Sequence, residues 1–142
     1  MKTLRIEALT ENLPNVLSFI DGELEANGCP IRVQMQIDIA VEEMYINIAS
    51  YAYAPNTGDA QIDIDISGND PKVATIHLYD SGVAFDPLAK PDPDITLSVD
   101  ERAIGGLGIY MVKQTMDSVS YEYKNGKNHF VIVKNLVDEP DA

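Results

Sequence analysis

The residues best suited to chemistry in this chain form three short motifs. Together they offer an oxygen ligand for a metal, a carboxylate that accepts hydrogen bonds, and a glycine-rich entry to a helix. Each motif alone is common, because acid and amide pairs, Asp-x-Gly turns and glycine runs occur in many proteins. Their order along one chain predicts an ATP site built from Glu43 with Asn47, Asp80 with Gly82, and Gly105, Gly106 and Gly108.

In the first motif, Glu43 and Asn47 are four residues apart, so on a helix their side chains share one face. Mg²⁺ prefers oxygen ligands and takes few from protein, so Asn47 can supply one while phosphates and water complete the shell. Glu43 can then orient or deprotonate a nucleophile near the terminal phosphate. The alternative is the polar face of a half-buried helix; Glu42 points off that face and is assigned to solvent.

In the second motif, Asp80 follows the strand-like run of residues 73–79. A carboxylate there can accept a hydrogen bond from the exocyclic amine of adenine, and Gly82 lets the backbone come close to the base. The alternative is an Asp-Ser-Gly turn that ends a strand and binds nothing.

In the third motif, Gly105, Gly106 and Gly108 lead into an apolar, helix-like run. Free amides and the positive end of the helix dipole can receive phosphates there. The spacing is not that of a P-loop or of a dinucleotide fold, and a plain loop-to-helix entry is the alternative. Arg102 is a candidate contact to the terminal phosphate, or an ordinary surface arginine.

The elements that must position these motifs follow from the apolar periodicity. Alternation predicts a strand over residues 3–8, and spacings of three and four predict a helix from Glu11, capped by Thr10, to Asn27-Gly28. Residues 31–53 fit both a strand period and a helix period. Their length without a turn residue favours a helix.

The second half of the chain predicts two β-hairpins with a loop and a helix between them. Residues 80–106 contain three prolines and no period, which predicts a long functional loop such as a nucleotide lid, and a helix should follow over residues 107–116. The hairpins are residues 61–67 with 72–79, and residues 119–123 with 129–134 around Asn125-Gly126.

Composition limits the class of protein. A chain of 142 residues with 45% hydrophobic content predicts one domain over residues 1–137 and a frayed tail over 138–142. The chain has no long apolar run and no secretory pattern, and its single cysteine, Cys29, fits a reducing compartment. We therefore expect a cytoplasmic protein.

The charge balance limits the partners. The net charge of -13 comes from 23 acidic and 10 basic residues, so nucleic acid and anionic membranes should be repelled. The acidic excess can serve solubility, or it can steer the protein toward a basic partner. His77 and His129 have no further metal-ligating residues at metal spacing and are interpreted as structural or surface residues.

Taken together, the motifs resemble the Bergerat ATP-binding fold of histidine kinases, gyrase-type ATPases and Hsp90 chaperones. The run from Gly108 to Tyr121 is similar to bacterial anti-sigma factor serine/threonine kinases. The resemblance covers nearly the whole chain. It implies an α+β fold, a two-layer α/β sandwich whose mixed, mainly antiparallel sheet is covered on one face by helices.

The resemblance also implies a role for each motif residue. Asn47 would hold Mg²⁺ and Glu43 would act as the base. The residues expected to bind ATP are Asn47, Asp80, Gly82, Phe85, Arg102, Gly105, Gly106, Leu107 and Gly108. The lid, residues 86–103, is acidic and contains prolines, and it aligns poorly with sporulation-type kinases.

The implied activity is ATP-dependent phosphorylation of a serine on a STAS-type antagonist protein, with capture of a sigma factor and a possible homodimer. Glu43 beside Asn47 favours a kinase, because binding alone needs no base. The alternative function is a non-catalytic ATP-binding module that orders its lid and presents a surface to a partner.

Overall fold

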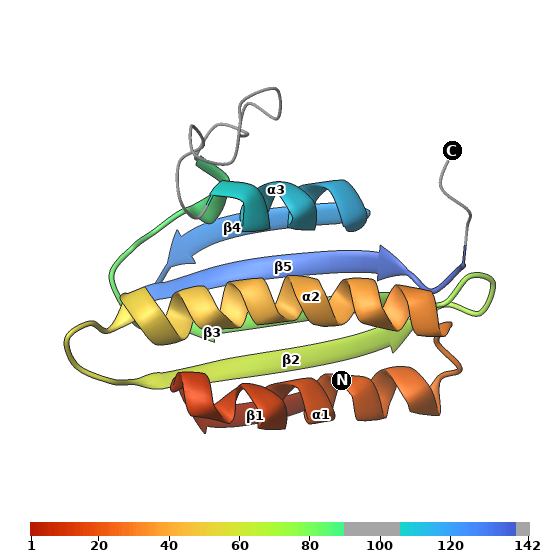
Figure 1. Cartoon of the computed structure of the whole chain (residues 1–142), viewed down its shortest axis with the longest axis horizontal. Coiled ribbons are helices and arrows are strands. Elements are labelled where there is room, and N and C mark those ends of the chain that lie inside the picture. Colours follow the sequence, from red (N-terminus) through yellow and green to blue (C-terminus); the bar gives the residue numbers. More distant parts are fainter. Residues whose placement is uncertain (90–105, 139–142) are drawn as a thin grey trace.

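The computed structural model describes residues 1–89 and 106–138 and arranges them in two layers, a five-stranded sheet with helices over one face (Figure 1). The strand order is β1-β2-β3-β5-β4. This confirms the predicted two-layer α+β sandwich. The strands are β1 (Lys2–Glu7), β2 (Asp59–Ser67), β3 (Val73–Asp80), β4 (Ser118–Lys124) and β5 (Lys127–Asn135), and the α-helices are α1 (Leu13–Ala26), α2 (Ile31–Asn47) and α3 (Gly106–Thr115).

Every strand pair in this sheet is antiparallel. The sheet of the described residues is therefore wholly antiparallel, where we expected a mixed sheet that is mainly antiparallel. The central pairing joins β3 to β5, which places Asp80 opposite Asn128. Two residues from distant parts of the chain thus meet at one end of the sheet.

The two predicted hairpins are confirmed. β2 pairs with β3, and β4 pairs with β5 through a tight turn in which Asn125 (φ 55°) and Gly126 (φ 76°) are both left-handed. Asn and Gly tolerate that conformation, which is the reason why they favour a two-residue hairpin turn. The turn therefore sets the register of β5 against β4.

Helix α1 begins later than the sequence predicts. Residues Thr10–Asn12 form a short 3₁₀ turn, η1, and Thr10 makes no capping hydrogen bond through its side chain. The prediction that Thr10 caps a helix beginning at Glu11 is wrong, because the 3₁₀ turn comes first and the α-helix starts at Leu13, with Pro14 in its first turn. The predicted end is confirmed, since Gly28 is left-handed (φ 71°).

Helix α2 resolves the ambiguity between strand and helix in favour of a helix. It does not continue as a regular α-helix to Tyr53, as the sequence predicts, but changes after Asn47 into a π-helical turn, η2 (Ile48–Ala52). The extra residue in such a turn redirects the chain, and π-turns are frequent at functional sites.

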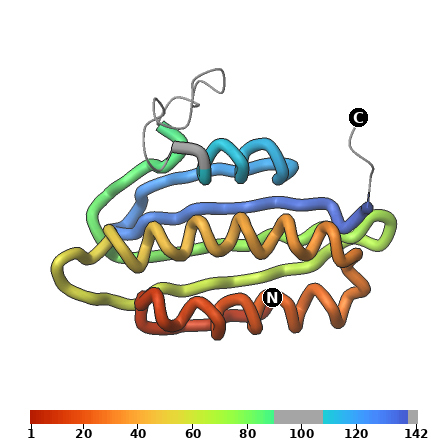
Figure 2. Tube along the Cα trace, viewed as in Figure 1, coloured from red at the N-terminus to blue at the C-terminus, as the bar shows by residue number. Residues whose placement is uncertain are grey.

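The core lies between the sheet and the helices. Its fully buried members include Ile20 on α1, Ile37 on α2, and Ile62 and Ile76 on the sheet. The tube view shows α1 and α2 side by side, running along the strands on one face of the sheet (Figure 2). The burial of each helix on one side explains why its apolar residues recur at spacings of three and four.

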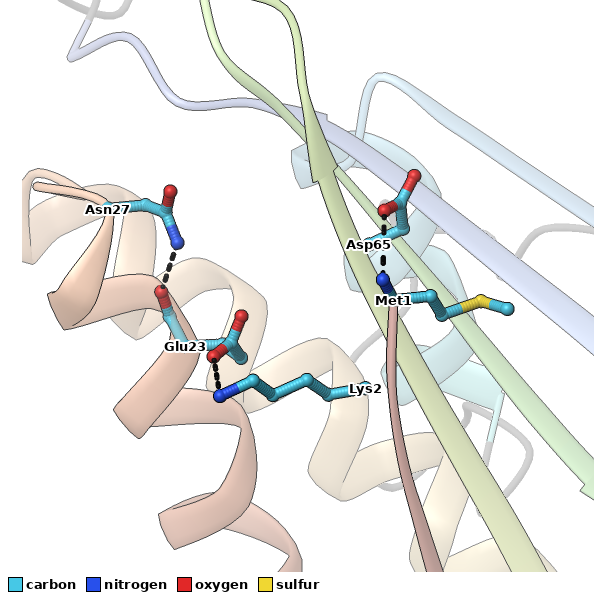
Figure 3. A network of polar contacts seen from close by, with 5 residues as sticks. All are labelled: Met1, Lys2, Glu23, Asn27 and Asp65. Atoms are coloured by element: carbon cyan, nitrogen blue, oxygen red, sulfur yellow. Dashed lines mark hydrogen bonds and ion pairs between the residues drawn. The ribbon is translucent and has the colours of Figure 1, made fainter.

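Polar contacts hold the edge strand β1 against its neighbours (Figure 3). Lys2 Nζ lies 3.0 Å from Glu23 Oε1 on α1, and the amino terminus of Met1 lies 3.6 Å from Asp65 Oδ1 on β2. Asn27 Nδ2 donates to the Glu23 carbonyl at 2.9 Å near the end of α1. These exposed pairs contribute little stability each, but they mark where β1 meets α1 and β2.

The other face of the sheet carries polar side chains from β3, β4 and β5. His77 Nδ1 and His129 Nε2 lie 2.8 Å apart, and the Tyr79 ring stacks on His129 with centroids 4.2 Å apart.

In the part of the chain that the structure describes, no helix is both long and apolar enough to cross a membrane.

Candidate functional site

A pocket of about 260 Å³ opens between the C-terminal part of α2, its π-turn, and the ends of β3 and β5. This volume is slightly below the roughly 300–1,000 Å³ typical of small-molecule sites, so it suits one part of a ligand, such as a flat base. The lining is mostly apolar or aromatic and consists of Met44, Asn47, Ile48, Tyr51, Ala52, Leu78, Asp80, Val83, Ala84, Phe85, Pro87, Tyr121, Asn128 and Phe130.

Asp80 lines this pocket and is only 6% exposed. Its Oδ1 accepts hydrogen bonds from the Gly82 amide at 2.9 Å and from Asn128 Nδ2 at 2.8 Å. Burial raises the pKa of the carboxyl, while these two donors lower it. Neither bond uses Oδ2, so among the described residues this oxygen is left to accept a hydrogen bond from an amine in the pocket.

Asn128 links both sides of the pocket. Besides Asp80, its Nδ2 reaches the Val83 carbonyl at 2.9 Å, and its Oδ1 accepts from the Phe85 amide at 3.1 Å and from the Tyr121 hydroxyl. Because Asn128 is 6% exposed, each of these bonds forms where an unpaired polar atom would be costly. The network fixes the course of the chain after β3.

Sequence reasoning missed Asn128 and Tyr121 as site residues. In the sequence, Asn128 looks like a residue that flanks the Asn125-Gly126 turn, and Tyr121 has the spacing of a cross-strand packing residue. Tyr121 does pair with Phe130, but its hydroxyl also bonds to Asn128 and to the Phe85 amide at 3.2 Å. A polar residue at a core-facing strand position was the available signal.

Asn47 lies at the end of α2 and lines the pocket together with Asp80 and Phe85. Three predicted site residues are thus brought together from α2, β3 and the segment after β3. Phe85 is 47% exposed and forms part of the rim. Gly82 does not line the pocket; a Cβ there would overlap the Ala52 carbonyl, so only glycine permits this approach of the loop to the π-turn.

Glu43 lies one turn before Asn47, outside the pocket lining and against α3. A Cβ on Gly108 would overlap its carboxyl group, so the two residues are in close contact. Burial, and then the negative charge of Glu42, raise the pKa of Glu43. A carboxylate with a raised pKa is a stronger base than an exposed one, which suits proton abstraction.

The glycine motif is described in part. Gly106, Leu107 and Gly108 begin α3. The predicted helix over residues 107–116 is confirmed, with both of its ends one residue earlier in the structure. This helix start therefore faces Glu43 through Gly108. Arg102, Gly105 and most of the predicted lid lie outside the described residues.

The side chains around the pocket could hold a metal ion only together with a nucleotide that supplies further oxygen ligands. Within residues 1–89 and 106–138, no three His, Cys, Asp or Glu side chains come together as a preformed metal site. Any Mg²⁺ would therefore depend on the Asn47 amide oxygen and on oxygens that the nucleotide itself brings. Mg²⁺ is held in this way at many phosphate sites.

Comparison with known proteins agrees with this geometry. The family model described as "Histidine kinase-like ATPase domain" matches residues 6–134. The chain belongs to this family. Membership implies ATP binding. The pocket, the end of α2 at Asn47 and the start of α3 all lie within the matched ATPase domain.

A curated relative is the serine/threonine-protein kinase BtrW of Bordetella bronchiseptica, which is 27% identical over 137 residues, 96% of this chain and 95% of the relative. A solved structure, the RsbU and RsbW domains of Rv1364c from Mycobacterium tuberculosis, has the same fold, with a TM-score of 0.65 at 13% identity. The match covers 96% of this chain and 33% of that one. The predicted resemblance is therefore confirmed at the level of the histidine kinase-like ATPase domain.

Proposed function

We propose that this protein is an ATP-dependent serine/threonine kinase whose substrate is a serine on a STAS-type antagonist protein, and that it regulates a sigma factor through that partner. The single observation that carries the proposal is that two residues with different proposed roles, the metal ligand Asn47 and the base Glu43, lie one turn apart on α2. Asn47 lines the base-sized pocket, and Glu43, one turn earlier, contacts the first turn of α3 at Gly108.

In this proposal the pocket receives the adenine. Asp80 accepts the hydrogen bond of its exocyclic amine through Oδ2, and the apolar walls cover the faces of the ring. Asn128 keeps Asp80 oriented through its 2.8 Å bond to Oδ1. The phosphates extend toward the amides at the start of α3, where the helix dipole favours negative charge.

Asn47 and Glu43 would act where the γ-phosphate meets the reacting serine. Asn47 would hold Mg²⁺ through its amide oxygen, and the ion would neutralise charge on the phosphates. Glu43 accepts the proton of the serine hydroxyl while the serine oxygen bonds to the γ-phosphorus and the bond to the ADP oxygen breaks. Arg102 and Gly105 are proposed as further phosphate contacts, by the resemblance alone.

The partners are proposed by the same resemblance and by the similarity to BtrW, which is itself named as a serine/threonine-protein kinase. The STAS-type antagonist supplies the serine, and a sigma factor and a second copy of this chain are the further proposed partners. The net charge of -13 is compatible with protein partners and unfavourable for direct contact with nucleic acid.

The first experiment is calorimetric titration of the protein with ATP, with and without Mg²⁺, beside Asn47→Ala. The wild type should bind with Mg²⁺-dependent affinity, and Asn47→Ala should lose about tenfold in the presence of Mg²⁺ and little in its absence. Transfer of labelled γ-phosphate to a STAS-domain protein, with the same protein lacking its serine as control, then tests the kinase. Failure of the wild type to bind ATP would overturn the proposal.

A further inference from the structure

The residue that follows the π-turn, Tyr53, connects three segments around the pocket without lining it. Its hydroxyl accepts a hydrogen bond from the Ser81 amide at 2.7 Å and donates one to the Asp59 carbonyl at 2.6 Å. Ser81 directly follows Asp80, and Asp59 is the first residue of β2. One hydroxyl thus joins the end of α2, the start of β2 and the end of β3.

The ring of Tyr53 is held as firmly as its hydroxyl. A Cβ on Gly58 would overlap ring atoms of Tyr53, so the ring lies directly on the backbone before β2. This close approach needs a glycine, and it limits the positions that the hydroxyl can take. The π-turn supplies the change of direction that brings Tyr53 to this position.

Ala52, the last residue of the π-turn, contacts the same loop after β3. The Ala52 carbonyl accepts a hydrogen bond from the Val83 amide at 3.0 Å, and it lies where a Cβ on Gly82 would be. Residues 81–83 are therefore each in contact with Ala52 or Tyr53. Of the pocket residues, Asp80 directly precedes this segment and Val83 is its last residue.

We propose that Tyr53 is a positioning residue of the nucleotide pocket, which sets the orientation of Asp80 toward the base by holding residues 81–83 against the π-turn. The inference rests on the proposed nucleotide binding. Its consequence is specific: loosening this loop affects the choice between adenine and guanine, because that choice depends on the direction of the Asp80 carboxylate.

The test is Tyr53→Phe, which keeps the ring on Gly58 and removes the hydroxyl. The matched control is Tyr45→Phe on α2, because the Tyr45 hydroxyl also donates to the backbone, at 2.7 Å to the Leu9 carbonyl, and this buried residue does not line the pocket. By calorimetry, Tyr53→Phe should bind ATP about tenfold more weakly, with a preference for ATP over GTP reduced several-fold. Tyr45→Phe should change neither by more than about twofold, although it also loses stability.

Amide hydrogen exchange in the nucleotide-free protein gives a readout that needs no ligand. The amides of Ser81 and Val83 should exchange faster in Tyr53→Phe than in the wild type and be unchanged in Tyr45→Phe. Wild-type affinity and specificity in Tyr53→Phe would overturn the inference alone. Unchanged exchange at these amides would also overturn it. Absence of ATP binding by the wild type would instead overturn the proposed function.

A second variant tests the ring. Gly58→Ala should displace the Tyr53 ring although Tyr53 keeps its hydroxyl. It should weaken ATP binding by about the same factor as Tyr53→Phe. If both changes act through the same loop, the double variant Tyr53→Phe/Gly58→Ala should lose less than the sum of the two single effects. Fully additive losses would contradict a shared route through Tyr53.

Discussion

The proposed nucleotide pocket holds a buried carboxyl group and the junction between α1 and α2 holds two half-buried ones, but their surroundings support them in opposite ways. In the pocket, Asp80 receives hydrogen bonds from Gly82 and Asn128. In the junction, Asp21 and Asp38 face each other, and the Oδ1 atom of each is buried without a hydrogen-bond donor among the described residues. Donors supplied by the protein orient the first carboxylate, whereas no such donor reaches the Oδ1 atom of either member of the second pair among the described residues.

The difference appears in the energetics of the two regions. Burial, followed by the hydrogen bond and charge of Asp21, raises the pKa of Asp38 to about 8, and Glu25 and Glu42 add to the effect. No cation accompanies this cluster among the ion pairs of the described residues. The Asp80 carboxylate at the end of β3 is thus held by hydrogen-bond donors, whereas the half-buried Asp38 in the middle of α2 costs stability when it is charged.

The largest effect should come from Glu43→Gln, which removes the proposed base and keeps the size of the side chain. Phosphoryl transfer should fall by about 10²–10⁴, because a positioned base typically contributes that much. ATP affinity should stay within about twofold, since Glu43 does not line the pocket. Rates of transfer and calorimetric affinities, measured on the same preparation, check both parts.

The matched control is Glu42→Gln, the neighbouring acid on the exposed side of α2. Its transfer rate should stay within about twofold of the wild type, with a small downward shift of the pH profile, because loss of its charge lowers the pKa of Glu43. Equal transfer by Glu43→Gln and the wild type would show that the base has been assigned to the wrong residue.

The next largest effect should come from Asp80→Asn in the pocket. We expect ATP to bind about 100-fold more weakly, equivalent to about 2.7 kcal/mol, because an acceptor matched to the adenine amine is lost. Asp63→Asn is the control: Asp63 is equally buried, at 5% exposure, but lies on β2 with its side chain on the opposite face of the sheet. If both variants bound ATP equally well, Asp80 would not read the base.

A smaller effect, on stability alone, should come from Asp38→Asn in the junction. The folded-state pKa of Asp38 is above its unfolded value, so the folded protein binds this proton more tightly. Its contribution is therefore fully favourable below about pH 4 and is lost as the pH rises toward about 8. Asparagine keeps a donor for Asp21 at every pH and should remove this loss.

Denaturant unfolding at several pH values measures that change. At pH 8, Asp38→Asn should raise the free energy of unfolding by on the order of 1–2 kcal/mol, because partial exposure screens much of the repulsion. The difference from the wild type should shrink toward pH 4, and ATP affinity should not change. The exposed turn residue Asp70 gives the control variant, Asp70→Asn, and a wild-type pH profile in Asp38→Asn would contradict the raised pKa of Asp38.

Much of this protein could be predicted from local patterns. The spacing of apolar residues indicated α1, most of α2 and both hairpins, because each element buries one side and its period records which side that is. The left-handed turn at Asn125 and Gly126 followed from their backbone freedom. Asn47, Asp80 and Phe85, chosen from short motifs, do line one pocket.

Only the tertiary structure decided which distant residues support those motifs. Asn128 reaches Asp80 because β3 pairs with β5, Tyr53 reaches Ser81 through a π-turn, and Gly108 receives Glu43 where α3 packs on α2. Periodicity reports the side on which a residue is buried, but not which strand or helix lies opposite. That choice depends on pairing and packing between segments far apart in the chain, so it is made only when the whole core forms.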